Sequence, residues 1–203
     1  MADLAHEKHD GPLEYATQES RLNILGFWIF LGAEIALFST LFATYLVLNG
    51  RTGNSPTPQD LFELKDVMIE TLLLLTSSFT CGLAVHEMRG GRVKSLITWL
   101  IITLLLGAGF LFMEISEFIH YVGEGATLQS SGFWSGFFVL VGTHGAHVTL
   151  GIFWMIFIII QLTQRGLTSA TARKVFIVGL YWHFLDVVWI FIFTLVYFKG
   201  MVN

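Results

Sequence analysis

The stretch ILGFWIFLGAEIALFSTLFATYLVL, residues 24–48, decides the fold class. Glu34 is its only Asp, Glu, Lys, Arg or His residue. As an α-helix rising 1.5 Å per residue, the stretch would be about 37 Å long. The hydrocarbon core of a bilayer is about 30 Å thick, so a helix of this length and composition can span it. The chain is therefore expected to contain at least one transmembrane helix.

Four further stretches have the length and apolar character of spanning helices. They cover residues 67–86, 95–119, 133–161 and 175–198. The three prolines of the chain all lie outside these stretches, so no proline kink is expected in a span. The sequence therefore predicts an all-α integral membrane protein, a bundle of five transmembrane helices.

The overall composition excludes several classes of protein. Of the 203 residues, 54% are hydrophobic and only 13% are charged, whereas about a quarter of a soluble domain is charged. With 11 Lys and Arg against 15 Asp and Glu, the chain lacks the basic surface that nucleic acid requires, so no nucleic-acid partner is expected. A single cysteine, Cys81, excludes a disulfide scaffold, a CxxC pair, a c-type heme attachment and a thiolate zinc site.

The charged residues outside the spans predict the orientation. Residues 1–23 are acidic and are expected to form a solvated cytoplasmic tail ahead of the transmembrane domain, residues 24–203. This tail and the loops after the second and fourth stretches carry eight Lys and Arg, and the opposite side carries three. Because positive residues are retained on the cytoplasmic side, the amino terminus is predicted inside and the carboxyl terminus outside.

Ionisable residues within spans are costly and usually face the interior of a bundle. Counting along the helices with this orientation places five of them in one inner-to-middle layer: Glu34, His144, His147, His183 and Asp186. The three histidines could form part of a metal or heme site, although hydrogen-bonded pairs between helices are the favoured interpretation. For Glu34, a proton relay or lipid-headgroup contact and a neutral acid bonded to a histidine both remain open.

A second polar cluster is expected at the outer face. It comprises Glu70 at the start of its span, with Glu114, Glu117 and His120 at the end of another. Glu114 and Glu117 are three residues apart, so both point to one side of a helix and could hold a metal or relay a proton. Solvation at the membrane interface is the favoured interpretation. No catalytic residue and no metal site are predicted in the chain.

Small residues four apart suggest places where helices approach closely. The pairs are Gly32 with Ala36, Gly142 with Ala146, and Gly145 with Thr149. These pairs are common in spanning helices, so they predict packing without naming the partner helix.

Several longer strings carry a family resemblance. THGAHVTLG at 143–151 and YWHFLDVVWIF at 181–191 resemble signatures of subunit 3 of the heme–copper oxidases, the cytochrome c oxidase subunit III family. GFWIFLGAE at 26–34 and EISEF at 114–118 are similar to other parts of that family, and the resemblance extends from Gly26 to Gly200. Cytochrome c oxidase members have seven helices. Five helices point to the quinol oxidase branch, and RLNILGFW at 21–28 and VHEMRGG at 85–91 look most like the heme aa3-type menaquinol oxidases of Gram-positive bacteria.

The resemblance implies a respiratory complex in the bacterial cell membrane that oxidises quinol, reduces oxygen to water and pumps protons. Heme and copper would lie in subunit 1, and this chain would carry no redox centre. It would contact subunit 1, assemble with subunits 2 and 4, support stability and proton uptake, and hold phospholipid between its helices. The family's buried carboxylate maps onto Glu34, its His-x-x-His onto His144 and His147, and its His–Asp pair onto His183 and Asp186.

Two other classes remain as alternatives. One is a self-standing membrane protein that binds heme or metal through His144, His147 and His183. The other is a small transporter, although the internal repeats and broken helices common in transporters are not evident in the sequence. An enzyme would retain a chromophore or metal when isolated, whereas a subunit would be colourless alone.

Overall fold

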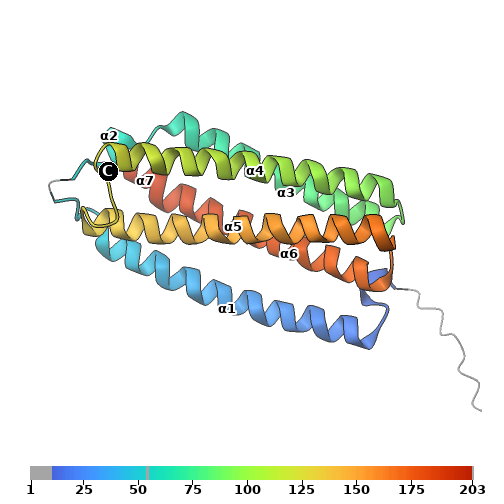
Figure 1. The fold of residues 1–203 in the computed structure, drawn as a ribbon. Helices are drawn as coiled ribbons and strands as arrows, with labels where there is room; N and C mark the ends of the chain where they lie inside the picture. Colours follow the sequence, from blue (N-terminus) through green and yellow to red (C-terminus); the bar gives the residue numbers. More distant parts are fainter. Residues whose placement is uncertain (1–10, 54, 203) are drawn as a thin grey trace, which may run out of the picture.

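Five long apolar helices run side by side along one axis in the computed structural model, which describes residues 11–53 and 55–202 (Figure 1). No strand occurs in these ranges. The long helices confirm the predicted all-α architecture with five spans. They are α1 (Gln18–Leu48), α3 (Leu64–Arg89), α4 (Val93–Gly123), α5 (Gly132–Arg165) and α6 (Ser169–Ile192).

Shorter elements complete the chain. A 3₁₀ turn, η1 (Leu13–Tyr15), precedes α1, and α2 (Pro58–Leu61) precedes α3. After α6 the last span continues as a π-helical segment, η2 (Phe193–Phe198), and then as α7 (Lys199–Val202). A π-helix has one more residue in its hydrogen-bonded ring than an α-helix, so it changes the direction in which later side chains point.

The helices are longer than the apolar stretches that predicted them. The first begins at Gln18, six residues before the expected start, because the Thr17 side chain accepts the backbone N–H of Ser20 and caps the helix. The last begins at Ser169, where Thr168 and Thr171 form a reciprocal capping box. Capping side chains, which lie outside the apolar core, therefore determine where these helices start.

The residues just before α1 are packed against the bundle, which differs from the solvated tail expected for the whole of residues 1–23. Glu14 in η1 is fully buried, and Arg89 at the end of α3 binds its carboxylate at 2.8 Å. The same η1 turn packs against α6. Residues 1–10 of the expected tail lie outside the described residues.

The last span lies at the centre of the bundle and contacts α1, α3 and α5. Two of its tryptophans, Trp182 and Trp189, are buried and donate their indole N–H groups to hydroxyls of α3. Trp182 reaches Ser77 at 3.0 Å, and Trp189 reaches Thr71 at 3.1 Å. Each bond satisfies a polar group that would otherwise be unpaired in the apolar interior.

The Trp182 ring occupies a slot that exists because two facing residues lack side chains. A Cβ added to Gly107 of α4 would lie 2.6 Å from Trp182 Cζ2, and one added to Gly151 of α5 would lie 3.0 Å from Cζ3. The indole N–H closes the third side of the slot by bonding to Ser77 of α3. One side chain of α6 therefore holds three other helices together.

The small-residue pairs differ in what they contact. A Cβ on Gly145 would meet the Glu114 carboxyl at 2.7 Å, so this glycine lets α4 approach α5. A Cβ on Gly142 would be in ordinary contact with Phe118 of α4, at 3.6 Å. At Gly32 of α1 a Cβ would meet nothing within 4 Å, so that pair does not pack against another helix of this chain.

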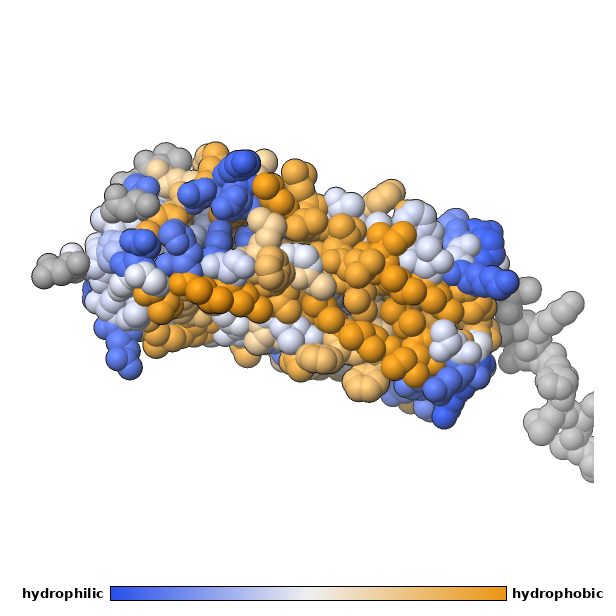
Figure 2. Space-filling view, turned by 45° about the horizontal axis from the view of Figure 1, so that its top comes forward, coloured by the Kyte–Doolittle hydropathy of each residue, from blue (hydrophilic) through white to orange (hydrophobic). Residues whose placement is uncertain are grey.

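The surface has the pattern of a membrane protein. Hydrophobic residues cover the middle of the face drawn in Figure 2, and hydrophilic residues gather toward both ends. Large apolar side chains are strongly exposed on the long helices, among them Phe112 at 73% and Ile29 at 69%. The start of α1 and the end of α7 lie at opposite ends of the bundle (Figure 1). A hydrocarbon environment accounts for the exposed apolar side chains, and an odd number of spans accounts for the opposite ends.

Candidate functional site

One polar contact across the bundle joins Glu34 of α1 to His147 of α5. The distance from Nε2 of His147 to Oε2 of Glu34 is 3.1 Å, and both side chains are largely buried. The other ring nitrogen, Nδ1, donates to the carbonyl oxygen of Thr143 at 2.7 Å, because a carbonyl can only accept. A hydrogen bond between Nε2 and the carboxyl therefore requires a proton on one of the two groups, with either the acid or the ring N–H as the donor.

Aromatic side chains surround this pair. The Phe38 ring lies 5.2 Å from the His147 ring, and the Tyr181 hydroxyl donates to the backbone carbonyl of His147 at 3.1 Å. The ring centroids of Phe38 and Phe184 of α6 are 6.1 Å apart. Because these groups limit the access of water, the Glu34–His147 contact is held in an environment of low polarity.

His144 lies one turn away from His147 but has different surroundings. Its side chain is fully buried, and neither ring nitrogen has a hydrogen-bond partner within residues 11–53 and 55–202. Its ring stacks on that of Trp189, with 5.4 Å between the ring centroids, and it makes edge-to-face contacts with Phe110 and Phe38. The structure therefore places this histidine among aromatic rings, away from a hydrogen-bonded carboxylate.

The remaining two members of the predicted layer meet at a serine of α3. Nδ1 of His183 lies 2.7 Å from Oγ of Ser78, and the buried Asp186 side chain lies beside the same serine. Ser78 was not identified from the sequence. The available signal was a run of hydroxyl residues, Thr76, Ser77 and Ser78, inside an otherwise apolar stretch.

The members of the second polar cluster belong to α3 and α4, and they differ in exposure. Glu70 is fully buried and Glu114 is 2% exposed, which differs from the interfacial solvation expected for them. Glu117 is half-buried and accepts a 3.0 Å hydrogen bond from the Tyr197 hydroxyl of η2, while His120 is exposed. Neighbouring helices cover the first two carboxyls, which a count along a single helix cannot show.

The three histidines of the alternative hypothesis are not brought together as one set of ligands. His147 uses both ring nitrogens for Thr143 and Glu34, His183 uses Nδ1 for Ser78, and His144 lies between aromatic rings. Within residues 11–53 and 55–202, no group of three or more His, Cys, Asp and Glu side chains is arranged to hold a metal ion. The polar layer therefore has the geometry of contacts between helices.

Two apolar hollows follow α1. One, of about 440 Å³, lies between α1 and α6 and is lined by residues such as Phe42 and Phe191. The other, of about 510 Å³, lies toward the start of α1, where Asn23 and Arg173 add polar groups. The two hollows together have apolar walls along α1 and the guanidinium group of Arg173 near one end.

The fold and the polar layer define a multi-pass membrane protein whose buried ionisable groups mostly bond to neighbouring helices. The family model for cytochrome c oxidase subunit III matches residues 3–201. A protein of Bacillus spizizenii named quinol oxidase subunit 3 is 65% identical over 99% of this chain and 98% of its own length, and its Bacillus subtilis counterpart is 64% identical over the same shares. A probable quinol oxidase subunit 3 of Staphylococcus saprophyticus is 54% identical over 96% of this chain and 98% of its own.

The chain belongs to the cytochrome c oxidase subunit III family. This confirms the resemblance drawn from the strings at 143–151 and 181–191.

Proposed function

We propose that the chain is the non-catalytic subunit 3 of a respiratory, proton-pumping quinol oxidase. The observation that carries the proposal is the 65% identity to a quinol oxidase subunit 3 along almost the whole of both chains. The complex would oxidise quinol and reduce oxygen to water in the bacterial cell membrane. Heme and copper would lie in subunit 1, which this chain contacts directly, and subunits 2 and 4 would complete the assembly.

The Glu34–His147 pair is the proposed contribution to proton uptake. A carboxyl and an imidazole 3.1 Å apart exchange one proton without a change in their geometry. The pair also fixes α1 against α5, so a role in stability is part of the same proposal. His183 and Asp186, joined to α3 at Ser78, are proposed to fix α6 in the same way.

Bound phospholipid is proposed for the hollows along α1. Their apolar walls suit acyl chains. Arg173 near one end binds Glu19 through one nitrogen at 3.2 Å, and the other N–H donors of its fork suit a phosphate. Lipid extraction from the purified complex, followed by mass spectrometry, tests this assignment. The Arg173→Ala variant is expected to retain less phospholipid than the wild type, and an unchanged lipid content would contradict it.

The proposed orientation places the amino terminus in the cytoplasm and the carboxyl terminus outside. It is supported by the eight Lys and Arg expected on one side against three on the other. The opposite positions of the first and last helix ends in the bundle agree with an odd number of spans (Figure 1).

The test of the subunit role is a reduced-minus-oxidised visible spectrum of the complex purified through a tag on this chain. The spectrum is recorded on the intact assembly and again after the chain has been separated from its partners. Heme bands that remain with larger partner chains support the proposal. Bands that follow this chain would contradict it and would favour the self-standing heme or metal protein.

The test of the proton role uses the complex reconstituted in liposomes. Glu34→Gln is expected to preserve assembly and to lower proton uptake modestly, because the amide cannot give up a proton. Glu124→Gln, which changes an exposed acid in the loop after α4, is the matched control. Loss of assembly in Glu34→Gln alone would favour a purely structural role, and equal uptake in both variants would contradict the relay.

A further inference from the structure

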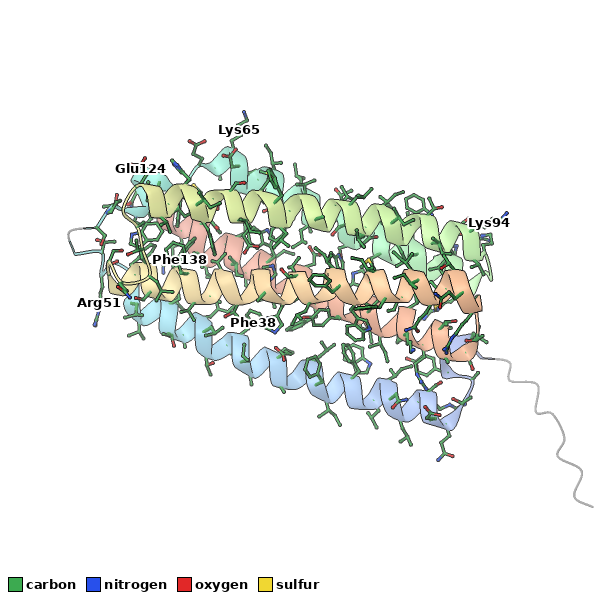
Figure 3. The ribbon with its side chains drawn as sticks, in the orientation of Figure 1. Phe38, Arg51, Lys65, Lys94, Glu124 and Phe138 are labelled. Atoms are coloured by element: carbon green, nitrogen blue, oxygen red, sulfur yellow. The ribbon has the colours of Figure 1, made fainter. Side chains whose placement is uncertain are left out.

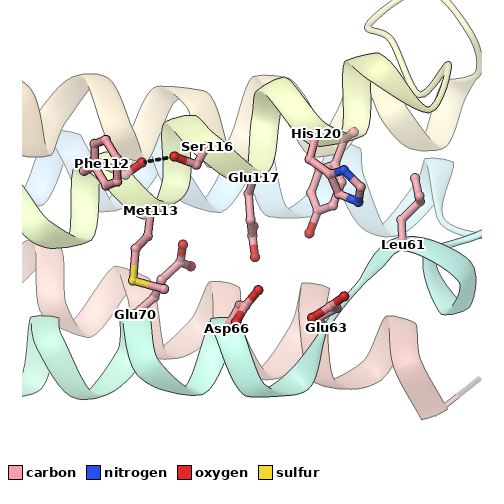
Figure 4. A pocket seen from close by; sticks show the side chains of 10 residues that line it. Leu61, Glu63, Asp66, Glu70, Phe112, Met113, Ser116, Glu117 and His120 are labelled. Carbon is pink, nitrogen blue, oxygen red and sulfur yellow. Dashed lines mark hydrogen bonds between the residues drawn. The ribbon is translucent and has the colours of Figure 1, made fainter.

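A pocket between α3 and α4 combines many carboxyls with few cations. It has a volume of about 280 Å³, and we call it the acidic pocket. Its ionisable lining comes from Glu63, Asp66 and Glu70 on the α3 side and from Glu117, His120 and Tyr121 on α4. Figure 4 shows the carboxyls of the two helices pointing into the space between them. The lining contains no Lys or Arg, and the nearby Lys65 extends away from the bundle (Figure 3).

The innermost carboxyl of the pocket lacks a partner. Glu70 is fully buried, lines the pocket, and neither of its oxygens accepts or donates a hydrogen bond within the described residues. The facing Glu117 accepts a hydrogen bond from the Tyr197 hydroxyl through one oxygen, and its other oxygen lies near Tyr121 without a well-formed hydrogen bond in the part of the chain that is described. A buried polar group without a hydrogen bond costs about 1–3 kcal/mol. The unpartnered Glu70 carboxyl and the free oxygen of Glu117 face the same pocket, so a ligand there could bind both of them.

The helix dipole does not explain this arrangement. Acidic residues are favoured in the first turn of a helix, which accounts for Glu63 and Asp66 at the start of α3. Glu70 lies more than one turn further along, beyond the range of that effect. Glu117 lies toward the carboxyl-terminal end of α4, where the dipole does not favour negative charge.

The carboxyls also form a graded path from the surface inward. Glu63 is exposed, Asp66 is half-buried and Glu70 is buried, and the three follow one another at three- and four-residue intervals. Intervals of three and four place side chains on one face of a helix. A cation would thus be attracted at the mouth and would bind most tightly at the inner end.

We propose that the acidic pocket binds a hydrated divalent cation, Mg²⁺ or Ca²⁺, between Glu70 and Glu117. Carboxylate oxygens are the ligands these ions prefer, and Mg²⁺ in particular keeps several waters while it binds one or two carboxylates. No three described His, Cys, Asp or Glu side chains are arranged for direct ligation, so waters would have to complete the shell around an ion held by two carboxylates. A water occupies about 30 Å³, so 280 Å³ holds an ion with six waters.

The test uses Mn²⁺ as the probe, because it shares the preference for carboxylate and water ligands. The intact complex is treated with a chelator, desalted and titrated with MnCl₂, and free Mn²⁺ is measured by electron paramagnetic resonance. Wild type, Glu70→Gln and Glu117→Gln are compared with the control Glu124→Gln, whose acid is exposed at the same end but does not line the pocket. Because Mn²⁺ sites on other subunits are the same in every variant, they do not contribute to the difference in bound Mn²⁺ between variants.

The wild type and the control are expected to bind one more Mn²⁺ than the two pocket variants. The dissociation constant is expected near 10⁻⁴–10⁻³ M, on the order of other weak external cation sites, with competition by Mg²⁺ or Ca²⁺. Equal binding by all four complexes would overturn the proposal. If either glutamine variant fails to assemble, Glu63→Gln at the exposed mouth serves instead. Glu63→Gln should raise the dissociation constant for Mn²⁺ several-fold, and an unchanged dissociation constant would also overturn the proposal.

Discussion

The slot for Trp182 allows one substitution to be worked through in detail. In Gly107→Ala the new Cβ would lie 2.6 Å from Cζ2 and 2.7 Å from Cη2 of Trp182. Carbon atoms in contact prefer about 3.5–4.0 Å, so the ring or α4 must move by about 1 Å. The ring cannot simply withdraw. Gly151 of α5 borders the ring closely on one side, and the indole N–H of Trp182 is bonded to the Ser77 hydroxyl at 3.0 Å.

Overpacking of this kind costs about 1–3 kcal/mol. Alanine also stabilises a helix by about 1 kcal/mol relative to glycine, which would mask part of the effect. Gly109→Ala is therefore the matched control: it lies on the same helix, and its Cβ would be in ordinary contact with Leu73 at 3.8 Å. The difference between the two alanine variants isolates the clash, and it corresponds to about 2–12 °C in melting temperature for a chain of this size.

The assay is the temperature at which half of this chain is lost from the purified complex, measured at one fixed heating rate because such unfolding is often irreversible. Gly107→Ala is expected to melt below Gly109→Ala. Combining Gly107→Ala with Trp182→Phe, which has a smaller ring, should cost less than the sum of the single changes. If the two alanine variants melt within about 1 °C of each other, the slot is not rigid and the reasoning is wrong.

Three further outcomes are expected. Trp189→Phe should destabilise the chain by about 1 kcal/mol, because Thr71 loses the indole donor 3.1 Å away; an unchanged melting temperature of the complex would contradict this. Arg89→Ala should cost about 1–3 kcal/mol by leaving the buried Glu14 carboxylate unpaired, as measured against Arg165→Ala, and should make the amino-terminal segment more sensitive to protease. Replacing Glu124 by cysteine should allow labelling only from outside in intact cells, since the chain's own Cys81 is buried; labelling only in opened cells would reverse the orientation.

The number and identity of the spans could be predicted because length and apolarity are properties of each helix alone. The ends of the spans could not, because Thr17 and Thr168 act through capping bonds that apolarity does not record. The π-helical segment η2 likewise has no signal in the pattern of apolar residues. It matters because Tyr197, which bonds to Glu117, lies within it.

The polar residues could be identified but not partnered from the sequence. Depth along a helix brought Glu34 and His147 into one layer, and the structure places them in contact at 3.1 Å. Depth alone does not give the rotation of each helix about its axis. That rotation directs His144 toward Trp189 and leaves Glu70 buried, so neighbours on other helices had to be known before their surroundings could be described.

The Trp182 slot also bears on the order in which the protein is made. Ser77 and Trp182 are 105 residues apart in the chain. At a synthesis rate of about 5–20 residues per second, α3 would wait about 5–20 s on the ribosome before the indole that bonds to it is made. During that interval the earlier helices can insert, but their shared slot is empty and the Ser77 hydroxyl lacks its indole donor. Synthesis of the last helix is therefore the step that fills the slot and supplies the indole donor to Ser77.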